Sequence, residues 1–424
     1  MQTTMQGISN KAKLKPKHRF QNLYRILNEE MLEKAFYKLK NGKAAGVDKI
    51  SKSAYKVDLK ENISEVVEQL KRKSYKAKLV KRVYIPKEKN KKRPLGIPAV
   101  SDKLLQTLVA EILTAIHEED FYPNSYGYRR GKGATDAVKD LSKELQYGNY
   151  KYIVEADIKG FFDNMKHEWI ENMLKLRIDD KAFIRLIKKW LKAGILEEDG
   201  KVIHPETGSP QGGVVSPVIA NIYLHYALDN WFEKVVKKNS RGKVYLCRYA
   251  DDFVCAFQHK EDAERFYRVL SRRLEKFGLE VAAEKTRILQ FDRDDSKGNR
   301  KFNFLGFEFR WGKTRKGKMG IKRRTSTKKQ RKALADFTEW CRKIGSMTKK
   351  EIFKTLNSKL RGHYNYYGII GNYKSMGVFY YKAIRILFKW MKRKSFKGRL
   401  NWKKFKFYLK VYEVMKPRIV HVFY

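Results

Sequence analysis

Three aspartates follow short apolar segments in the middle of the chain. Asp157 ends the segment YIVEAD, and Asp251 and Asp252 separate VYLCRYA from FVCAFQH. Adjacent acids repel each other and lack the glycine that a tight hairpin prefers, and most acids in turns are simply well solvated. A divalent cation reverses this balance because it supplies the counter-charge. If both segments are strands ending at one sheet edge, the three carboxylates form a phosphoryl-transfer site with two ions about 3.5–4 Å apart.

Two other segments contain groups that suit a phosphorylated ligand. The loop 207–217 (TGSPQGGVVSP) has glycines that let the backbone approach a ligand, and Gln211 both donates and accepts hydrogen bonds. Lys87 and Arg93 flank a charged turn and would hold a triphosphate. Each feature alone has an ordinary alternative, because the loop could be any ordered turn and cations are common throughout this chain.

The surrounding pattern predicts the strands and helices that would carry these residues. Residues 243–259 read as strand, two-residue turn and strand, with Asp251 and Asp252 as the turn. The other expected elements are a helix at 20–39, a loop at 42–48, a helix at 59–71, strands at 77–86 and 152–157, and helices within 169–196. Composition changes after residue 311, and the helical spacing of Leu334, Phe337, Trp340 and Cys341 indicates a further helical domain from about 315–325.

The charge of the chain indicates a polyanionic partner. The 424 residues carry a formal net charge of +49, and 42% hydrophobic and 13% aromatic residues suffice for a folded interior. A folded protein with this excess of positive charge repels itself unless it binds a polyanion, and nucleic acid is the favoured one. A membrane surface is the competing partner, but the sequence has neither an amphipathic basic helix nor a lipidation signal. The length suits two or three domains.

The sequence also argues against a membrane or secreted protein. No apolar run reaches about 18 residues, so we expect no transmembrane helix. Residues 1–20 lack the apolar centre of a secretory signal. Cys247, Cys255 and Cys341 form no CxxC pair, which argues against both a disulfide framework and a zinc site. We therefore expect a cytoplasmic protein.

Eight segments occur in an order that indicates a known family. They are NGKAAGVDKI, YIPKEKNKKRPLGIP, SYGYRRGKGATDAV, EADIKGFFDN, GSPQGGVVSPVIANIYL, RYADDF, LEVAAEKT and FNFLGFEF. In order and spacing they resemble the successive sequence blocks of bacterial group II intron reverse transcriptases. The later segments LRGHYNYYGIIGNYKSMGVFY and PRIVH resemble the maturase (thumb) domain of the same proteins. The resemblance covers nearly the whole chain from about residue 21.

This resemblance implies an α+β right-hand polymerase with helical fingers, an antiparallel-sheet palm and a helical thumb. The implied domains are a basic N-terminal extension at 1–20, fingers with part of the palm at 21–152, the palm at 153–312, and a thumb or maturase domain with a basic C-terminal tail at 313–424. The protein would copy group II intron RNA into cDNA during retromobility and bind that RNA to assist splicing. The reaction would use two Mg²⁺ ions, for which Mn²⁺ can substitute. Its partners would be intron RNA, an RNA template with a DNA primer, dNTPs and target DNA, within a bacterial cytoplasmic ribonucleoprotein whose oligomeric state stays open.

The resemblance also assigns roles to individual residues. Asp157, Asp251 and Asp252 would hold the metals, together with the carbonyl of Ile158. The residues implied to contact the incoming dNTP are Lys87, Arg93, Gln211, Lys285 and Phe162, with Phe161 as the alternative to Phe162. Phe162 would exclude a ribose 2′-hydroxyl, and Lys285 would protonate the leaving pyrophosphate. The implied primer grip is Phe304, Leu305, Gly306 and Phe307.

Two basic regions are expected to contact nucleic acid. Residues 313–332 hold eleven Lys or Arg and no acid, although a solvated loop is the alternative. Residues 361–373 mix cations with tyrosines, of which at least half are expected to pack helices instead. The residues expected to bind nucleic acid are Arg129, Lys322, Arg323, Arg324, Arg361, Tyr364 and Asn365. The apolar positions expected to be helical core are Phe379, Ala383, Ile386, Leu387 and Trp390.

The chain departs from the family pattern in a few places. Arg130 stands where proline is usual and Thr135 where histidine is usual, which would alter template contacts rather than polymerisation. No cysteine pairs or His-Asn-His cluster follow the thumb segments, so the endonuclease domain of many relatives is expected to be absent. The alternatives to the intron role are a domesticated relative in phage defence, CRISPR spacer acquisition or DNA repair, and an RNA-binding splicing factor without polymerase activity.

Overall fold

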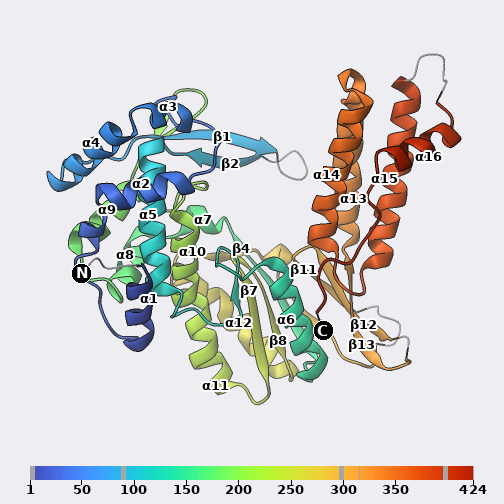
Figure 1. The fold of residues 1–424 in the computed structure, drawn as a ribbon. Coiled ribbons are helices and arrows are strands. Elements are labelled where there is room, and N and C mark those ends of the chain that lie inside the picture. The colour runs from blue at the N-terminus through green and yellow to red at the C-terminus, as the bar shows by residue number, and fades with distance from the viewer. Residues whose placement is uncertain (1–4, 87–91, 296–299, 315, 395–399, 424) are drawn as a thin grey trace.

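A group of N-terminal helices packs around one buried helix, α5 (Val100–His117). The computed structural model describes residues 5–86, 92–295, 300–314, 316–394 and 400–423 (Figure 1). Leucine, valine and isoleucine side chains on most sides of α5 are buried, because α1, α2 and α4 pack against it. The helices of this group are α1 (Met5–Leu14), η1 (Leu23–Ile26), α2 (Glu29–Lys38), α3 (Lys52–Val57) and α4 (Leu59–Lys71).

A small sheet extends from this helical group toward the C-terminal helices. Its strand order is β2-β1-β5-β6, with β1 and β2 antiparallel and β1 and β5 parallel. The β1–β2 hairpin projects toward helices α13 and α14 (Figure 1). The strands are β1 (Val80–Pro86), β2 (Lys92–Ile97), β5 (Ile195–Leu196) and β6 (Val202–Ile203).

The central sheet lies in the middle of the molecule and has the strand order β10-β4-β8-β7-β3. Strands β10, β4, β8 and β7 are antiparallel, β3 joins β7 in parallel, and β9 pairs with the end of β4. Its strands are β3 (Ser125–Tyr126), β4 (Tyr152–Lys159), β7 (Val244–Tyr249), β8 (Asp252–Phe257), β9 (Glu280–Val281) and β10 (Arg287–Gln290). The run FVCAF is apolar at every position because both faces of β8 are covered. Phe253, Cys255 and Phe257 belong to one core, whereas Val254 and Ala256 belong to the other.

Helices cover both faces of the central sheet. α12 (Lys260–Glu275) contacts β4 and β8, and α6 (Ala134–Tyr147) contacts β7. The remaining helices of this region are α7 (Phe161–Asn164), α8 (His167–Lys175), α9 (Lys181–Leu191), α10 (Ser216–Leu224), the π-helical turns η2 (His225–Asp229) and η3 (Phe232–Val236), α11 (Lys237–Asn239) and η4 (Ala283–Lys285).

The C-terminal part consists of a three-stranded antiparallel sheet followed by a helical domain. The sheet order is β11-β12-β13, formed by β11 (Lys301–Phe304), β12 (Phe307–Lys313) and β13 (Met319–Thr325). Helices α13 (Thr327–Arg342), α14 (Lys349–Tyr367), α15 (Tyr373–Lys394) and α16 (Trp402–Val411), with the turn η5 (Ile344–Ser346), form a separate hydrophobic core. Side-chain caps set the starts of three helices: Ser326 for α13, Thr348 with Glu351 for α14, and Asn401 for α16.

The structure confirms the mixed α+β class and corrects several expected elements. The expected helix 20–39 is broken, because a 3-10 turn is followed by Asn28, which caps α2 through the Met31 amide. The central sheet is mixed rather than wholly antiparallel, since β3 is parallel to β7. Residues 313–325 include β13, which pairs with β12, so the helical domain begins at Ser326. The expected core positions Phe379, Ala383 and Leu387 are buried, with Ile386 and Trp390 packed against them. Within the described residues, no helix is long and apolar enough to cross a membrane.

Candidate active site

Asp157 and Asp252 stand opposite each other on neighbouring antiparallel strands. They are direct partners in the register of β4 with β8. Side chains of directly opposite residues lie on the same face, with Cβ atoms about 4.5–5.5 Å apart. Side chains alternate between the two faces of a strand, so Ile153 lies on the same face as Asp157 and Val254 on the same face as Asp252. Both Ile153 and Val254 pack on the α6 side of the sheet. Both carboxylates therefore belong to the face that also carries β11, β12 and β13.

The hairpin between β7 and β8 differs by one residue from its expected form. Tyr249 pairs with Asp252, so the two turn residues are Ala250 and Asp251, and Asp252 is the first residue of β8. The expectation that Asp251 and Asp252 formed the turn was therefore wrong. Because of this shift, Asp252 is fixed by strand pairing, while Asp251 extends from the turn beside it. Ala250 adopts a left-handed φ of 54°.

Negative charge accumulates at this sheet edge. The Asp252 residue is accessible to solvent, yet the protein around its carboxyl removes part of its hydration, and this loss raises the pKa of the carboxyl above its ordinary value. The charges of Asp157, Asp251 and Glu155 also raise this pKa and Lys285 opposes them, which brings it to about 7. Like-charged carboxylates at this separation require a counter-charge to stay ionised together at neutral pH.

Lys285 supplies part of that counter-charge. It follows β9 on the turn η4, where the Ala282 amide donates to the Asp157 carbonyl at 2.8 Å. Its ammonium forms an ion pair with the Asp157 carboxylate, which raises the lysine's pKa. In the described part of the chain, no three His, Cys, Asp or Glu side chains converge closely enough to bind a metal ion as they stand. The Asp157 carboxylate instead faces an ammonium group. Ile158, next to Asp157, pairs with Val281 and has its side chain in the core.

The two phenylalanines after β4 occupy different environments. Gly160, at a φ of 55°, turns the chain into α7. Phe161 is 3% exposed and its ring packs edge-on against Tyr223, with 6.2 Å between ring centroids. Phe162 is half-buried and lies at the edge of the same core. The structure thus leaves Phe162, rather than Phe161, able to contact a ligand.

The glycine-rich loop packs against the backbone just after Phe162. The amide of Ser209 donates to the Phe162 carbonyl at 2.8 Å. A Cβ at Gly208 would lie 2.8 Å from that same carbonyl oxygen, so only glycine fits this contact. At the other end of the loop, the Gln211 carbonyl accepts a hydrogen bond of 2.5 Å from the Gly96 amide of β2. The loop therefore ties the β1–β2 hairpin to the chain segment that follows Asp157.

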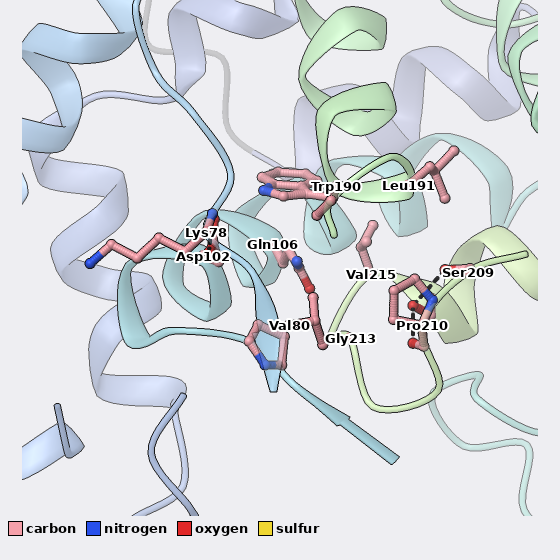
Figure 2. A pocket seen from close by; sticks show the side chains of 13 residues that line it. Lys78, Val80, Asp102, Gln106, Trp190, Leu191, Ser209, Pro210, Gly213 and Val215 are labelled. Carbon is pink, nitrogen blue, oxygen red and sulfur yellow. Dashed lines mark hydrogen bonds between the residues drawn. The ribbon is translucent and has the colours of Figure 1, made fainter. Parts of the chain in front are cut away.

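A small cavity lies on the inner side of this loop. Figure 2 shows Gln106, Ser209 and Pro210 among the side chains that line it. Gln106 accepts a hydrogen bond from the Val214 amide at 2.8 Å, which holds the loop on α5. The cavity has a volume of about 10 Å³, room for about one water molecule and no more. It is a packing feature of the loop and not a nucleotide pocket.

Arg93 lies on the exposed hairpin, and the Tyr128 hydroxyl is within the electrostatic influence of both Arg93 and Asp251. Arg93 pairs with Ile85 across β1 and β2, whereas Lys87 lies outside the described residues. Partial burial raises the pKa of the Tyr128 hydroxyl, Asp251 raises it further, and Arg93 opposes the increase. Tyr128 is 55% exposed at a left-handed φ of 57°. The sequence alone does not distinguish Tyr128 from the other tyrosines, because only its three-dimensional neighbours set it apart.

The expected primer grip is the turn of the β11–β12 hairpin. Phe304 pairs with Phe307 across a two-residue turn, Leu305–Gly306, in which both residues have positive φ. Both phenylalanine side chains are buried, so the turn presents its backbone rather than its rings. The hydroxyl of Tyr366, from α14, donates to the Leu305 carbonyl at 2.9 Å. Burial first, and then the charge of Asp252 among others, raises the pKa of Tyr366, which places this tyrosine near the acidic edge.

The expected nucleic-acid contacts divide into surface and interior residues. Those with accessible side chains are Lys322, Arg324, Arg361 and Asn365. Arg324 also pairs with Glu308 at 2.7 Å, and the Asn365 carbonyl contacts the His421 ring at 2.7 Å.

Three expected contacts are corrected because their side chains point inward. The Arg129 side chain is 5% exposed and pairs with Glu118, and its guanidinium also donates to two backbone carbonyls. Arg323 is buried over the Phe423 ring. Tyr364 is fully buried in the helical core. These three residues have interior partners, whereas Lys322, Arg324 and Arg361 keep their charged groups accessible.

Comparisons with known proteins agree with this arrangement. A family model described as reverse transcriptase (RNA-dependent DNA polymerase) matches residues 85–309. The group II intron-encoded protein LtrA of Lactococcus lactis is 30% identical over 447 aligned positions, covering 85% of this chain and 73% of that protein. Protein YkfC of Escherichia coli is 31% identical over 56% of this chain and 71% of its own length. An uncharacterized 91 kDa protein in the cob intron of Schizosaccharomyces pombe is 34% identical over 50% of this chain and 26% of its own length. The family match includes both strands of the acidic edge and the glycine-rich loop.

Proposed function

This chain belongs to the reverse transcriptase family, whose members are RNA-dependent DNA polymerases, and from that membership we propose that Asp157, Asp251 and Asp252 form its polymerisation centre. The observation that carries the proposal is the cross-strand pairing of Asp157 with Asp252, next to the turn that bears Asp251. In the proposed reaction, a primer 3′-hydroxyl attacks the α-phosphate of a dNTP and pyrophosphate leaves.

The donor set of this edge fits a divalent cation, and we assign Mg²⁺ to it. Carboxylate oxygens are preferred ligands of Mg²⁺, and a cation would relieve the repulsion by neighbouring carboxylates that, after loss of hydration, raises the pKa of Asp252. When bound, the ions lower the pKa of the attacking hydroxyl and stabilise the leaving oxygen. Lys285, now paired with Asp157, is a protonated group that would then be free to contact the pyrophosphate. The carbonyl of Ile158, adjacent to Asp157, is proposed as a further ligand.

The incoming dNTP would lie between the β1–β2 hairpin and the acidic edge. Arg93 supplies a cation from β2, and Lys87, outside the described residues, is proposed to act with it. Gln211 is tied to β2 through its carbonyl, which leaves its side-chain amide to contact the nucleotide. Phe162 borders the same region and is proposed to exclude a ribose 2′-hydroxyl. The turn Leu305–Gly306 would hold the primer through backbone groups.

We propose that these parts form the fingers, palm and thumb of a right-hand polymerase. The helices of residues 21–152 with the β1–β2 sheet would be the fingers, residues 153–312 the palm, and residues 313–424 the thumb, preceded by an extension at 1–20. The strand pairing favours extending the palm through β13, so that the thumb begins with α13 at Ser326. The β1–β2 hairpin and α14 would then lie on opposite sides of the template–primer duplex.

Primer extension on an RNA template with dNTPs and Mg²⁺ tests the proposed centre. Wild-type protein should give full-length cDNA, and Asp157→Asn should give none while it binds the template–primer as before. Glu261→Gln is the matched control, because it removes one exposed negative charge from the first turn of α12. Full activity of Asp157→Asn would exclude Asp157 from the centre.

We further infer that the protein acts with a group II intron, copying the intron RNA and assisting its splicing. The relative named LtrA is described as group II intron-encoded, and another relative, from Arabidopsis thaliana, as a nuclear intron maturase. The net charge of +49 and the accessible Lys322, Arg324 and Arg361 supply a surface for RNA phosphates.

The two activities are separable by Asp251→Ala. This variant should lose DNA synthesis and keep both intron binding and splicing assistance. The double variant Arg361→Ala with Lys322→Ala should instead weaken intron binding and lower the salt dependence of that binding. Loss of RNA binding by folded Asp251→Ala would contradict the separation.

A further inference from the structure

Directly beneath the acidic turn lies a guanidinium group with every donor engaged. Arg248, on β7, is 0% exposed. Its Nε and one terminal nitrogen donate to the two oxygens of Asp229 at 2.7 and 2.6 Å. The remaining N–H groups reach Ser125 Oγ at 2.6 Å, Asn221 Oδ1 at 3.0 Å and the carbonyl of Ala250 at 3.0 Å. All five N–H donors of the guanidinium are therefore satisfied.

The partners of Arg248 come from separate elements that meet behind the sheet. Asp229 is 2% exposed and ends the π-helical turn η2, while Asn221 lies on α10, which follows the glycine-rich loop. The amide of Asn221 in turn donates to the Gly127 carbonyl at 2.8 Å, next to Tyr128. The network thus connects the glycine-rich loop, the segment carrying Tyr128 and the acidic turn.

Ala250 is the point at which this network meets the turn. Its φ is 54°, a conformation that strains a residue with a Cβ and that hairpin turns usually assign to glycine. Both of its backbone polar groups are hydrogen-bonded. The amide donates to the Tyr126 carbonyl of β3 at 3.0 Å, and the carbonyl accepts from the Arg248 side chain of β7. The left-handed conformation of Ala250 is thus maintained by its surroundings and not by its residue type.

We propose that Arg248 is a positioning residue for nucleotide transfer, which holds the Ala250–Asp251 turn so that Asp251 faces Asp157. This inference rests on the proposed function, because it assigns the turn's geometry to metal binding. Arg248 lies on the opposite face of β7 from the acidic edge, so it touches neither substrate nor metal. Its contribution is the angle at which the turn presents Asp251, and hence the affinity of the edge for divalent cations.

A paired substitution separates positioning from general stability. Arg248→Met alone would leave the Asp229 carboxylate buried without its partner and would destabilise the fold. Arg248→Met with Asp229→Leu removes both charges and keeps an apolar interior. The matched control is Arg177→Met with Asp120→Leu, which removes another buried Arg–Asp pair, joined at 2.7 Å and placed near α1.

Two readouts distinguish the outcomes. Direct Mn²⁺ binding, measured by electron paramagnetic resonance without substrate, should weaken about tenfold in the Arg248/Asp229 pair, the scale seen when groups supporting metal ligands are removed. Single-nucleotide incorporation should need about tenfold more Mg²⁺, with a lower kcat and an unchanged KM for template–primer. The Arg177/Asp120 pair should match wild type in both measurements.

Ala250→Gly supplies a rescue that a merely structural role would not produce. Glycine adopts the positive φ without strain, so adding Ala250→Gly to the Arg248/Asp229 pair should recover part of the Mn²⁺ affinity. Wild-type Mn²⁺ affinity in the unrescued pair would overturn the role of Arg248. A wild-type protein that neither binds Mn²⁺ nor extends primers would instead overturn the proposed function on which it rests.

Discussion

The carboxylates of Asp157 and Asp252 occupy directly opposed positions on β4 and β8, on the one face of the central sheet that also carries the β11–β12 turn. Antiparallel pairing sets their spacing, so neither depends on a flexible loop for its position. Asp251 lies on the turn, so strand pairing does not set its position. We assign the reaction to this edge because its carboxylates repel one another when no cation is bound and are favourable around a cation.

Asp252→Asn should raise the thermal stability of the protein when no divalent cation is present. The substitution removes a charge from a group whose pKa is raised to about 7, and so relieves both dehydration and repulsion. We expect the apparent Tm in EDTA to rise by about 1–3 °C. Mg²⁺ should then stabilise wild type but not the variant, as followed by differential scanning fluorimetry. Equal stabilisation of both by Mg²⁺ would place the ion elsewhere.

Phe162→Ala should admit ribonucleotides, and Phe161→Ala should not. Phe162 is half-buried at the edge of the core, whereas Phe161 is 3% exposed within it. Incorporation of rNTP relative to dNTP should therefore rise in Phe162→Ala with little change in stability. Phe161→Ala should cost about 3–5 kcal/mol of stability and leave sugar selectivity as it was. Unchanged selectivity in Phe162→Ala would remove this residue from the sugar contact.

Tyr366→Phe should shorten the products of DNA synthesis. The variant loses the hydrogen bond of 2.9 Å from the Tyr366 hydroxyl to the Leu305 carbonyl, which joins α14 to the β11–β12 turn. The expected loss of stability is about 1 kcal/mol. Processivity on a long template, measured with a trap for dissociated enzyme, should fall more than the rate of a single incorporation. Tyr373→Phe, at an exposed position at the start of α15, is the control.

The helical C-terminal domain should lose stability in mildly acidic solution. Burial lowers the pKa of His363 to about 4, and its ring stacks on Phe379 with 3.8 Å between ring centroids. The unfolded chain, with a histidine pKa near 6.5, binds more protons between these two values. The stability that the neutral ring contributes is therefore complete above pH 6.5 and is lost as pH falls toward 4.

The contribution lost from His363 at pH 5 amounts to about 2 kcal/mol. His363→Phe keeps the stacking and removes the titration. Denaturation of this variant between pH 7 and pH 5 should show a shallower decline than that of wild type. Parallel declines in the two proteins would show that His363 does not titrate in this range.

Local pattern sufficed to predict the acidic edge but not its exact register. The apolar segments around Asp157 and Asp252 are strands because both faces of the sheet are covered, and this much follows from composition. Whether Asp252 is in the turn or the strand depends on a one-residue shift, which pairing with β4 and the hydrogen bond from the Ala250 amide to Tyr126 decide. Neither interaction is visible in the hairpin's own sequence.

Interior partners explain the site residues that were expected on the surface and lie inside. Arg129 is drawn inward by Glu118 and Arg323 by Phe423, and Tyr364 is buried among the C-terminal helices. A basic or aromatic residue in a basic chain fits a nucleic-acid surface and a buried anchor equally well. Only the position of the partner in the folded chain separates the two.

Iron-directed cleavage is the most direct test of the acidic edge as the metal centre. Fe²⁺ that replaces Mg²⁺ generates hydroxyl radicals where it binds, so wild-type protein with ascorbate and peroxide should be cut near Asp157 and near Asp251–Asp252. Excess Mg²⁺ should suppress both cuts, and Asp252→Asn should lose them. Cuts elsewhere in the chain, or cuts that persist in Asp252→Asn, would contradict the assignment of these carboxylates to metal binding.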